Sequence, residues 1–168
     1  DGFIARDNGA IDWLPALAAD GGDYGYGDFI AGMDGLIMGR GSYETVLAFA
    51  ELPYAVPVVV LSRSLPQDSV PAHLAGRVRI SDLEPAAIVA ELAQDGWSHA
   101  YVDGGKVIQS FLRAGLIQEM VISTVPVLLG QGRRLFGHLT QDVSLEHAGT
   151  QAFASGLVQS RYRVKPPA

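Results

Sequence analysis

The sequence predicts an α/β fold: a three-layer sandwich with a mostly parallel, mixed central sheet and antiparallel strands at the C-terminal end. Three observations lead to this prediction. Short apolar runs alternate with segments of helical spacing, which is typical of β-α-β units around a parallel sheet. Residues 56–61 are β-branched and apolar on both faces, as in a strand covered on both sides. Two extended segments, 143–153 and 157–164, flank Ser155-Gly156 and predict a terminal hairpin.

The spacing of apolar residues and the positions of glycine and proline predict the individual strands and helices. Before the hairpin, strands are expected at residues 36–38, 56–61, 78–80, 100–102 and 120–129, the last interrupted by Pro126. Residues 1–5 are expected to be the tail of a strand or the turn after one. Helices are expected from about Tyr26, and at residues 42–49, 84–95 and 106–113. Pro85 suits the first turn of its helix, and Gly115 suits the end of the last one. Residues 6–12 and 62–74 are expected to be polar loops.

Composition bounds the class of protein. A chain of 168 residues, 48% apolar and 18% charged, fits one domain spanning residues 1–168 without extensive disorder. With no cysteine, disulfides, thiolate metal sites and a cysteine nucleophile are excluded. The net charge of −6 and the scattered basic residues argue against nucleic-acid binding. No apolar run approaches the roughly 20 residues of a membrane span, and no leader pattern opens the sequence, so we expect a cytoplasmic protein without membrane contact.

Several chemistries lack their motif. No two of the four histidines stand at a metal-binding spacing, so no metal site is expected. The sequence contains no nucleophile elbow of the G-x-S-x-G type, no Walker A motif and no G-x-G-x-x-G.

One arrangement does carry chemical information. In three places an apolar strand ends and small or cationic residues follow: Leu36-Ile-Met-Gly-Arg-Gly-Ser42, Val58-Val-Val-Leu-Ser-Arg63 and Ala100-Tyr-Val-Asp-Gly-Gly-Lys106. Ligands of parallel α/β sheets bind beyond the carboxyl ends of the strands, and helix N-termini attract phosphates. Taken singly, each segment also fits a plain turn, a helix cap or a solvated arginine. Taken together, the three favour a clamp for a dinucleotide phosphate.

These motifs resemble a known family. Met38-Gly-Arg-Gly-Ser-Tyr-Glu44, Leu61-Ser-Arg63 and Val102-Asp-Gly-Gly-Lys106, in this order, are similar to motifs of the dihydrofolate reductase superfamily. Asp1-Gly-Phe-Ile-Ala5 and Val125-Pro-Val-Leu-Leu-Gly-Gln-Gly-Arg-Arg-Leu-Phe136 resemble one branch, the RibD C-terminal domain. The resemblance spans residues 1 to about 164. It implies a dihydrofolate reductase-like fold, and it leads us to expect that a short N-terminal strand is missing before Asp1.

The resemblance also implies a function. Members of the branch use NADPH to transfer hydride to a pyrimidine- or pterin-like heterocycle, as in the 5-amino-6-(5-phosphoribosylamino)uracil reductase step of riboflavin biosynthesis. We therefore expect an NADPH-dependent oxidoreductase with a small-molecule heterocyclic substrate, forming a homodimer. Two alternatives remain open: a non-catalytic NADP-binding protein of the same fold, or a weak dihydrofolate reductase. A reductase that uses a deazaflavin or another cofactor would show as absent NADPH binding.

Carried over residue by residue, the resemblance implies a cofactor site. Gly39, Arg40 and Ser42 would hold the pyrophosphate region. Leu61 would contact the cofactor, and Ser62 and Arg63 would meet the adenosine 2′-phosphate. Gly104, Gly105, Lys106 and Val107 would cradle the pyrophosphate, with a cis peptide bond between the two glycines. Ala5 would border the nicotinamide, and Asp12, Trp13 and Phe29 would contact the substrate.

The catalytic carboxylate of dihydrofolate reductases does not carry over. That acid lies one turn before a pocket-lining Phe, and matching Phe29 to this Phe puts Gly25 at the acid position. Asp28 is the remaining candidate for the catalytic residue, because the helix can start or rotate differently. Asp12, in the loop before Trp13, could instead bind a polar group of the substrate. The alternative for both carboxylates is that they cap local turns.

Dihydrofolate is therefore predicted to be at best a poor substrate, because protonation of its ring nitrogen relies on a buried acid. Steady-state assays with NADPH measure this, and turnover near the typical enzyme value of about 10 s⁻¹ would contradict it. If such turnover were found and disappeared in Asp28→Asn but not in Asp12→Asn, Asp28 would be identified as a displaced acid.

Overall fold

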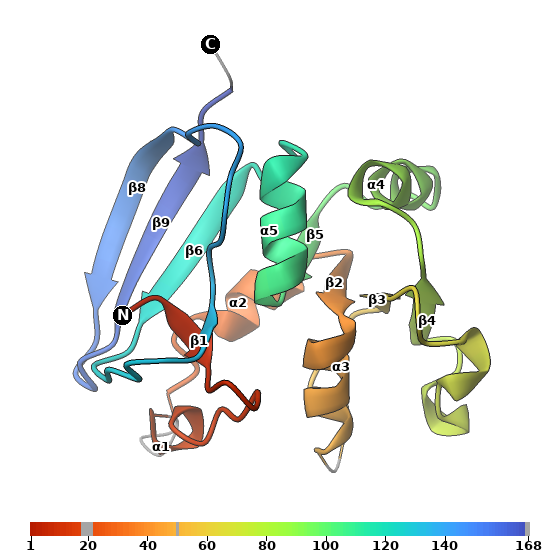
Figure 1. Ribbon diagram of the computed structural model, residues 1–168, viewed down its shortest axis with the longest axis horizontal. Coiled ribbons are helices and arrows are strands. Elements are labelled where there is room, and N and C mark those ends of the chain that lie inside the picture. Colours follow the sequence, from red (N-terminus) through yellow and green to blue (C-terminus); the bar gives the residue numbers. More distant parts are fainter. Residues whose placement is uncertain (18–21, 50, 167–168) are drawn as a thin grey trace. The chain divides into compact units, whose positions relative to one another are not determined.

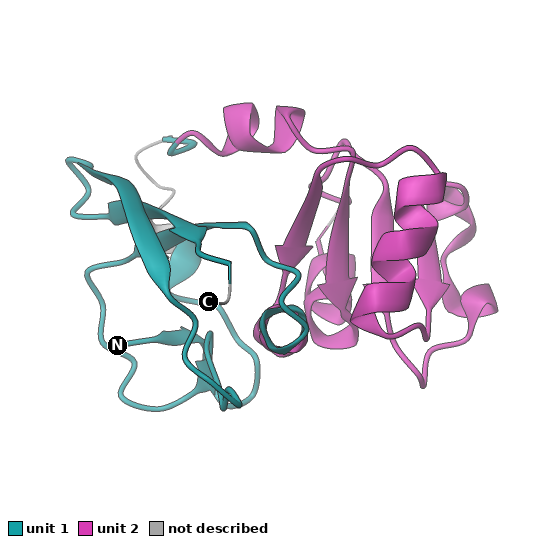
Figure 2. Cartoon of the chain, turned by 90° about the horizontal axis from the view of Figure 1, so that it is seen from above, with its two compact units in different colours: residues 1–24, 111–168 teal, residues 25–110 magenta. Residues whose placement is uncertain are grey.

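The computed structural model describes residues 1–17, 22–49 and 51–166 (Figure 1). These residues group into two compact units, and each is described by itself. The first unit comprises Asp1–Tyr24 and Phe111–Ala168, and the second comprises Gly25–Ser110 (Figure 2). No helix in the described ranges is long and apolar enough to cross a membrane.

A four-stranded parallel sheet forms the centre of the second unit. Its strand order is β4 (Val78–Ser81), β3 (Val58–Leu61), β2 (Gly35–Gly39), β5 (Ala100–Asp103). The helices of this unit are α2 (Tyr26–Ala31), α3 (Arg40–Leu47) and α4 (Pro85–Gln94), with two short 3-10 turns, Gln67–Ser69 and Ala72–Leu74. Helix α5 (Gly105–Arg113) begins in this unit and ends in the first. The parallel pairing β2–β3 and β2–β5 requires crossover connections, which α3 and α4 supply.

Both faces of the two central strands, β2 and β3, are buried. On one face, Leu36, Met38, Val58 and Val60 form a core with Tyr43 and Val46 of α3. Because successive side chains of a strand point to opposite faces, Ile37 and Val59 lie on the other face, and they are also almost fully buried. Continuous apolar runs in β2 and β3 follow from this double coverage.

A carboxylate fixes the start of β5. Asp34 Oδ2, just before β2, accepts hydrogen bonds from the backbone N–H groups of His99 (2.8 Å) and Ser98 (2.6 Å). These backbone donors lower the pKa of Asp34, because they favour the charged carboxylate. The contact holds the beginnings of β2 and β5 in their parallel register.

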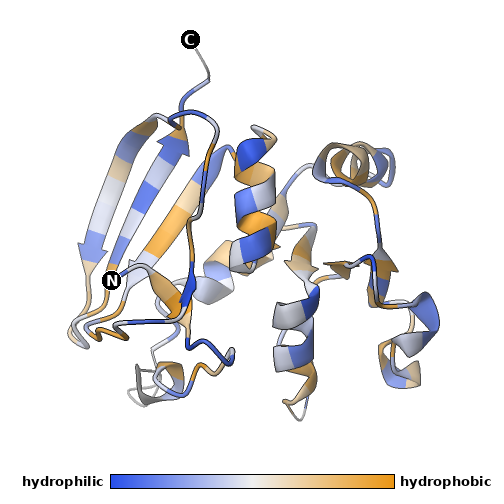
Figure 3. Ribbon diagram, in the orientation of Figure 1, coloured by the Kyte–Doolittle hydropathy of each residue, from blue (hydrophilic) through white to orange (hydrophobic). Residues whose placement is uncertain are grey.

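The first unit is built from antiparallel strands. β6 (Glu119–Thr124), β9 (Val158–Val164) and β8 (Leu145–Ala152) form one sheet in that order. β1 (Phe3–Ala5) pairs with β7 (Arg133–Arg134), and α1 covers Leu14–Leu17. Figure 3 shows mainly hydrophilic and intermediate shades along β8 and β9, in keeping with the nearly continuous exposure of β8.

The predicted fold class is confirmed: an α/β fold with a parallel central sheet plus antiparallel strands. In the structure the antiparallel strands form a sheet of their own, β6-β9-β8. The strand expected over residues 120–129 ends at Thr124, before Pro126, because proline has no N–H for a ladder hydrogen bond. Strand β7 was not predicted, since two residues carry no periodic signal.

Gly35→Ala is predicted to destabilise the protein. A Cβ at Gly35 would lie 1.9 Å from the Cη2 atom of Trp97, so the indole or the strand must shift. Overpacking of this kind costs about 1–3 kcal/mol, which urea unfolding measures. Gly32→Ala is the matched control, since its Cβ would make only an ordinary 3.6 Å contact at a negative φ. Equal unfolding midpoints for the two variants would contradict the prediction.

Candidate functional site at the carboxyl edge of the parallel sheet

The parallel register aligns the carboxyl ends of three strands. Gly39 of β2 is the partner of Leu61 of β3, and Met38 is the partner of Asp103 of β5. We call this side of the sheet the carboxyl edge. It carries ten of the residues that the sequence predicted for the cofactor site: Gly39, Arg40, Ser42, Leu61, Ser62, Arg63, Gly104, Gly105, Lys106 and Val107. All ten lie in the second unit.

Two glycine turns pack against each other at this edge. A Cβ at Gly104 would lie 2.6 Å from the Ser42 Oγ, so the β5–α5 turn touches the first turn of α3. A Cβ at Gly39 would lie 3.0 Å from the Cγ2 atom of Val107 in α5. A side chain at Gly104 would therefore displace the Ser42 hydroxyl, and a side chain at Gly39 would push against the Val107 methyl group. Ser42 is the third residue of α3 and does not cap it; Gly39 holds the N-cap position.

The prediction of a cis peptide bond between Gly104 and Gly105 is wrong, because the bond is trans. Gly104 instead has a left-handed φ of +86°, a conformation that glycine adopts without a Cβ clash. This φ turns the chain from β5 into α5, so the direction changes without a cis bond.

The predicted cationic residues of the carboxyl edge differ in their side-chain contacts. Arg40 donates from Nε to Glu44 (2.7 Å) and from Nη1 to Ser64 (3.1 Å), which ties α3 to the loop after β3. Arg63 pairs with Glu84, and both side chains are largely exposed. Lys106, in the first turn of α5, is exposed.

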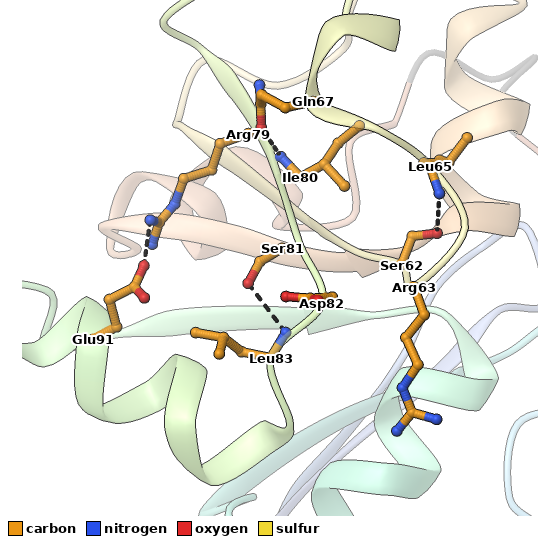
Figure 4. Close-up of a pocket in the computed structure, with 10 residues that line it drawn as sticks. All are labelled: Ser62, Arg63, Leu65, Gln67, Arg79, Ile80, Ser81, Asp82, Leu83 and Glu91. Carbon is orange, nitrogen blue, oxygen red and sulfur yellow. Dashed lines mark hydrogen bonds and ion pairs between the residues drawn. The ribbon is translucent and has the colours of Figure 1, made fainter.

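A groove of about 480 Å³ opens beside β3 and β4 (Figure 4). It is lined by Ser62, Arg63, Leu65, Gln67, Arg79, Ile80, Ser81, Asp82, Leu83 and Glu91. The Ser62 Oγ accepts hydrogen bonds from the backbone N–H groups of Ser64 (3.2 Å) and Leu65 (3.1 Å). Arg79 pairs with Glu91, so the charges of the groove are largely balanced. An anion bound here must therefore compete with carboxylates for the arginines.

The predicted residues Ala5, Asp12 and Trp13 belong to the first unit. Ala5 is buried in β1. Asp12 receives two hydrogen bonds from Arg6, at 2.6 and 2.9 Å, and these lower the pKa of Asp12. Trp13 is half-buried, and its indole Nε1 is buried without a hydrogen-bond partner in the described residues.

Helix α2 carries the other two predicted residues. Phe29 is half-buried, and its ring meets that of Tyr101 edge to face at a centroid distance of 5.1 Å. Asp28 lies in the first turn of α2 and is exposed. Gly25 is the N-cap, with φ +79°. The position where a dihydrofolate reductase-like acid was sought therefore has no side chain and lies outside the helix.

Sequence reasoning missed a tyrosine–carboxylate pair at the same edge. The Tyr101 Oη donates to Asp103 Oδ1 at 3.1 Å. Burial raises the pKa of Tyr101, and the negative charge of Asp103 raises it further. Asp103 belongs to the motif Val102-Asp-Gly-Gly-Lys106. The glycines and the lysine of this motif were enough to predict a phosphate-binding turn, so Asp103 received no role from the sequence. The i, i+2 spacing of Tyr101 and Asp103, which puts them on one face of a strand, was the available signal.

Gly104→Ala is predicted to destabilise the protein by two separable effects: strain at positive φ, about 1–3 kcal/mol, and the clash with Ser42. Ser42→Ala removes the Oγ and leaves a Cβ 3.7 Å away, an ordinary contact. The double variant should therefore lose less stability than the sum of the single variants. Urea unfolding of all four proteins measures this, and strict additivity would show that the two turns do not touch.

Comparisons with known proteins agree with this geometry. The chain is 33% identical over 164 residues to the uncharacterized Bacillus subtilis (strain 168) protein YwjB, covering 96% of this chain and 91% of YwjB. The crystal structure of a "putative riboflavin biosynthesis protein" from Shewanella sp. PV-4 is 36% identical at a TM-score of 0.91, covering 99% of this chain and 94% of that one.

A more distant structure shares the fold. It is the diaminohydroxyphosphoribosylaminopyrimidine deaminase/5-amino-6-(5-phosphoribosylamino)uracil reductase of Thermotoga maritima, 16% identical at a TM-score of 0.77, with 98% of this chain matching 54% of that one. The RibD C-terminal domain profile matches residues 1–159. The chain therefore belongs to the RibD C-terminal domain family.

Proposed function

We propose that this protein is an NADPH-dependent reductase that acts by hydride transfer on a pyrimidine- or pterin-like heterocyclic compound, of the 5-amino-6-(5-phosphoribosylamino)uracil reductase type. The observation that carries the proposal is the contact of the two glycine turns, Gly104 against Ser42 and Gly39 against Val107. Because the turns touch, the N-termini of α3 and α5 begin close together at one edge of the sheet, where both can meet the same ligand. Membership of a family that generally contains reductases supports the same conclusion.

The residues at the carboxyl edge fit a dinucleotide. Backbone N–H groups in the first turns of α3 and α5 have no partner within their helix, and they lie at the positive ends of the helix dipoles. Without a Cβ at Gly39 or Gly104, the two turns pack closely, so N–H groups of both can reach the same pyrophosphate. Gly39, Arg40 and Ser42 on one turn, and Gly104, Gly105, Lys106 and Val107 on the other, would hold the pyrophosphate. NADPH, when bound, supplies the hydride.

The groove beside β3 and β4 suits the adenosine end of the cofactor, next to Leu61. Its exposed Arg63 pairs with Glu84, and an exposed ion pair contributes only about 0–1 kcal/mol. A 2′-phosphate, with more charge and more acceptor oxygens than a carboxylate, can displace Glu84 from Arg63. The Ser62 hydroxyl lies on the same turn and can donate to the phosphate.

In the first unit, Ala5 would border the nicotinamide, and Asp12 and Trp13 would contact the substrate. In the second unit, Phe29 would contact the substrate. The buried indole Nε1 of Trp13, which lacks a partner in the described residues, is a donor suited to a polar group of the ligand. We further propose that the protein is a cytoplasmic homodimer.

A non-catalytic NADP-binding protein is the second candidate, and one observation favours it. The Gly25 position offers no acid, and Asp28 is exposed at the start of α2. A proton donor held next to a substrate is usually buried or partnered. Oxidation of bound NADPH in the presence of 5-amino-6-ribosylaminouracil 5′-phosphate would support the reductase. Tight NADPH binding without oxidation by any pyrimidine or pteridine would support the second candidate.

Arg63→Ala is predicted to weaken NADPH binding tenfold or more and to leave NADH binding nearly unchanged. Hydrogen bonds to a charged group are worth roughly 1.5–3 kcal/mol, and only NADPH carries the 2′-phosphate. Glu84→Gln should strengthen NADPH binding severalfold, because it removes the competing carboxylate. Titration calorimetry measures both effects.

Arg163→Ala is the matched control, since Arg163 also forms an exposed pair, with Glu119, and does not line the groove. It should leave both affinities unchanged. Equal loss of NADPH and NADH binding in Arg63→Ala would show that Arg63 does not contact the 2′-phosphate.

A further inference from the structure

Arg133 of β7 differs from most arginines of the chain, because no carboxylate of the described residues lies at ion-pair distance from it. Ion pairs with carboxylates are formed by Arg6, Arg40, Arg63, Arg79 and Arg163. Arg133 instead donates from Nε to the backbone carbonyl of Asp7, at 3.3 Å. Its side chain is exposed, and within the described ranges Nη1 and Nη2 have no acceptor. The outer N–H groups of this guanidinium are therefore available to a ligand.

A glycine turn orders the Arg133 guanidinium. A Cβ at Gly9 would lie 2.9 Å from Nη1, 3.0 Å from Cζ and 3.1 Å from Nη2. Because these distances are nearly equal, Gly9 lies over the flat face of the guanidinium and leaves the edge with the N–H groups uncovered. Gly9 also has a φ of +88°, which glycine adopts without a Cβ clash. The contact therefore requires glycine at this position.

The turn that carries Gly9 is itself held by hydrogen bonds. The Gly9 N–H donates to the Arg6 carbonyl (2.8 Å), and the Arg6 N–H donates to the Ala10 carbonyl (2.9 Å). The Asn8 Oδ1 accepts from the Ala10 N–H at 2.9 Å. The cover over the Arg133 guanidinium thus has a defined position.

The carboxylates of this loop leave the charge of Arg133 uncompensated. Asp12 accepts two hydrogen bonds from Arg6, and Asp7 offers Arg133 only its backbone carbonyl. A guanidinium presents its N–H groups as a planar fork that matches two oxygens of a phosphate. A fork that is already ordered loses less conformational entropy when it binds. The arrangement suits an anion with several oxygens, such as a phosphate monoester.

Strand pairing places this cation beside Ala5. Ala5 of β1 is the register partner of Arg133 in the antiparallel pair β1–β7. A Cβ at Gly132 would lie 2.2 Å from the Ala5 carbonyl oxygen, so the two backbones are in close contact. Ala5 is the residue proposed to border the nicotinamide. A substrate that meets the nicotinamide there would have its charged tail within reach of the long Arg133 side chain.

We propose that Arg133 binds the phosphate monoester of the substrate through Nη1 and Nη2, and that the Gly9 turn is the positioning element for this guanidinium. The identity of the ligand rests on the proposed function. The inference adds to that function the residue that selects a phosphorylated substrate over its dephosphorylated form.

The first test measures binding of ribose 5-phosphate and of ribose to the full chain by titration calorimetry. Arg133→Ala should weaken ribose 5-phosphate binding about tenfold or more, since it removes charge-assisted hydrogen bonds, and should not affect ribose. Arg161→Ala is the matched control, because Arg161 is exposed in β9 and also forms no ion pair among the described residues. It should behave as wild type.

Gly9→Ala separates an ordered site from simple attraction by charge. The new Cβ must displace the guanidinium, while the charge of Arg133 remains. Ribose 5-phosphate binding should fall severalfold, with NADPH binding unchanged as evidence of an intact fold. Wild-type affinity for ribose 5-phosphate in Gly9→Ala or in Arg133→Ala would overturn the inference. So would loss of binding in Arg63→Ala instead, or no saturable binding to the wild type at millimolar concentration.

Steady-state kinetics distinguish the phosphate of the substrate from that of a separate ligand. The two substrates are 5-amino-6-ribosylaminouracil 5′-phosphate and its dephosphorylated form. Arg133→Ala should raise KM for the phosphorylated compound about tenfold, with little change in kcat, and leave KM for the dephosphorylated compound unchanged. Loss of ribose 5-phosphate binding with a wild-type KM for the phosphorylated compound would assign the site to another phosphate ligand and overturn the proposal.

NADPH titrations separate this inference from the proposed function. NADPH should bind the wild type and Arg133→Ala equally well. If NADPH binds and ribose 5-phosphate binding does not depend on Arg133, the Arg133 inference alone fails. If the wild type binds no NADPH, the proposed function fails, while the cofactor-free titrations with ribose 5-phosphate still decide whether Arg133 binds a phosphate.

Discussion

The close approach of Gly104 to Ser42 is the constraint on which the rest of the site depends. A parallel sheet brings the carboxyl ends of β2 and β5 together, but the strands alone do not set how near the following helices can start. That distance is set by the missing Cβ at Gly104 and by its left-handed φ, which turns the chain directly into α5. Two sets of helix N–H donors thus lie close together at one strand edge, and Asp103 is the residue directly before Gly104.

The buried sheet explains why chemistry is confined to this edge. With Leu36 and Met38 covered on one face and Ile37 on the other, neither face of β2 can meet solvent or a ligand. Polar groups therefore gather where the strands end and the backbone is no longer paired. At this edge, Arg63 forms a weak, exposed ion pair with Glu84. A weak, exposed ion pair of this kind can exchange its carboxylate for a phosphate at little cost. Asp103 is half-buried, and its side chain accepts a hydrogen bond from Tyr101.

Much of this architecture could be predicted from the sequence, because it rests on local patterns. The β-branched run of β3, the proline at the first turn of α4 and the glycines before α5 each act within a few residues. The features that could not be predicted depend on contacts with residues distant in the sequence. Strand β7 exists because β1 pairs with it, and the partner of Arg63 is 21 residues away. The prediction of a cis peptide bond after Gly104 was wrong because it came from the family resemblance and not from the geometry of the turn. Asp103 was overlooked because its environment, and not its residue type, makes it unusual.

The central claim is that the two glycine turns at the ends of β2 and β5 bind the pyrophosphate of NADPH. A crystal structure of the protein with saturating NADPH tests it most directly. The account predicts pyrophosphate density within hydrogen-bond distance of backbone N–H groups in the first turns of α3 and α5, with the adenosine lying toward Ser62 and Arg63. Clear density for the dinucleotide at any other surface, or none at these turns at saturating cofactor, would contradict it.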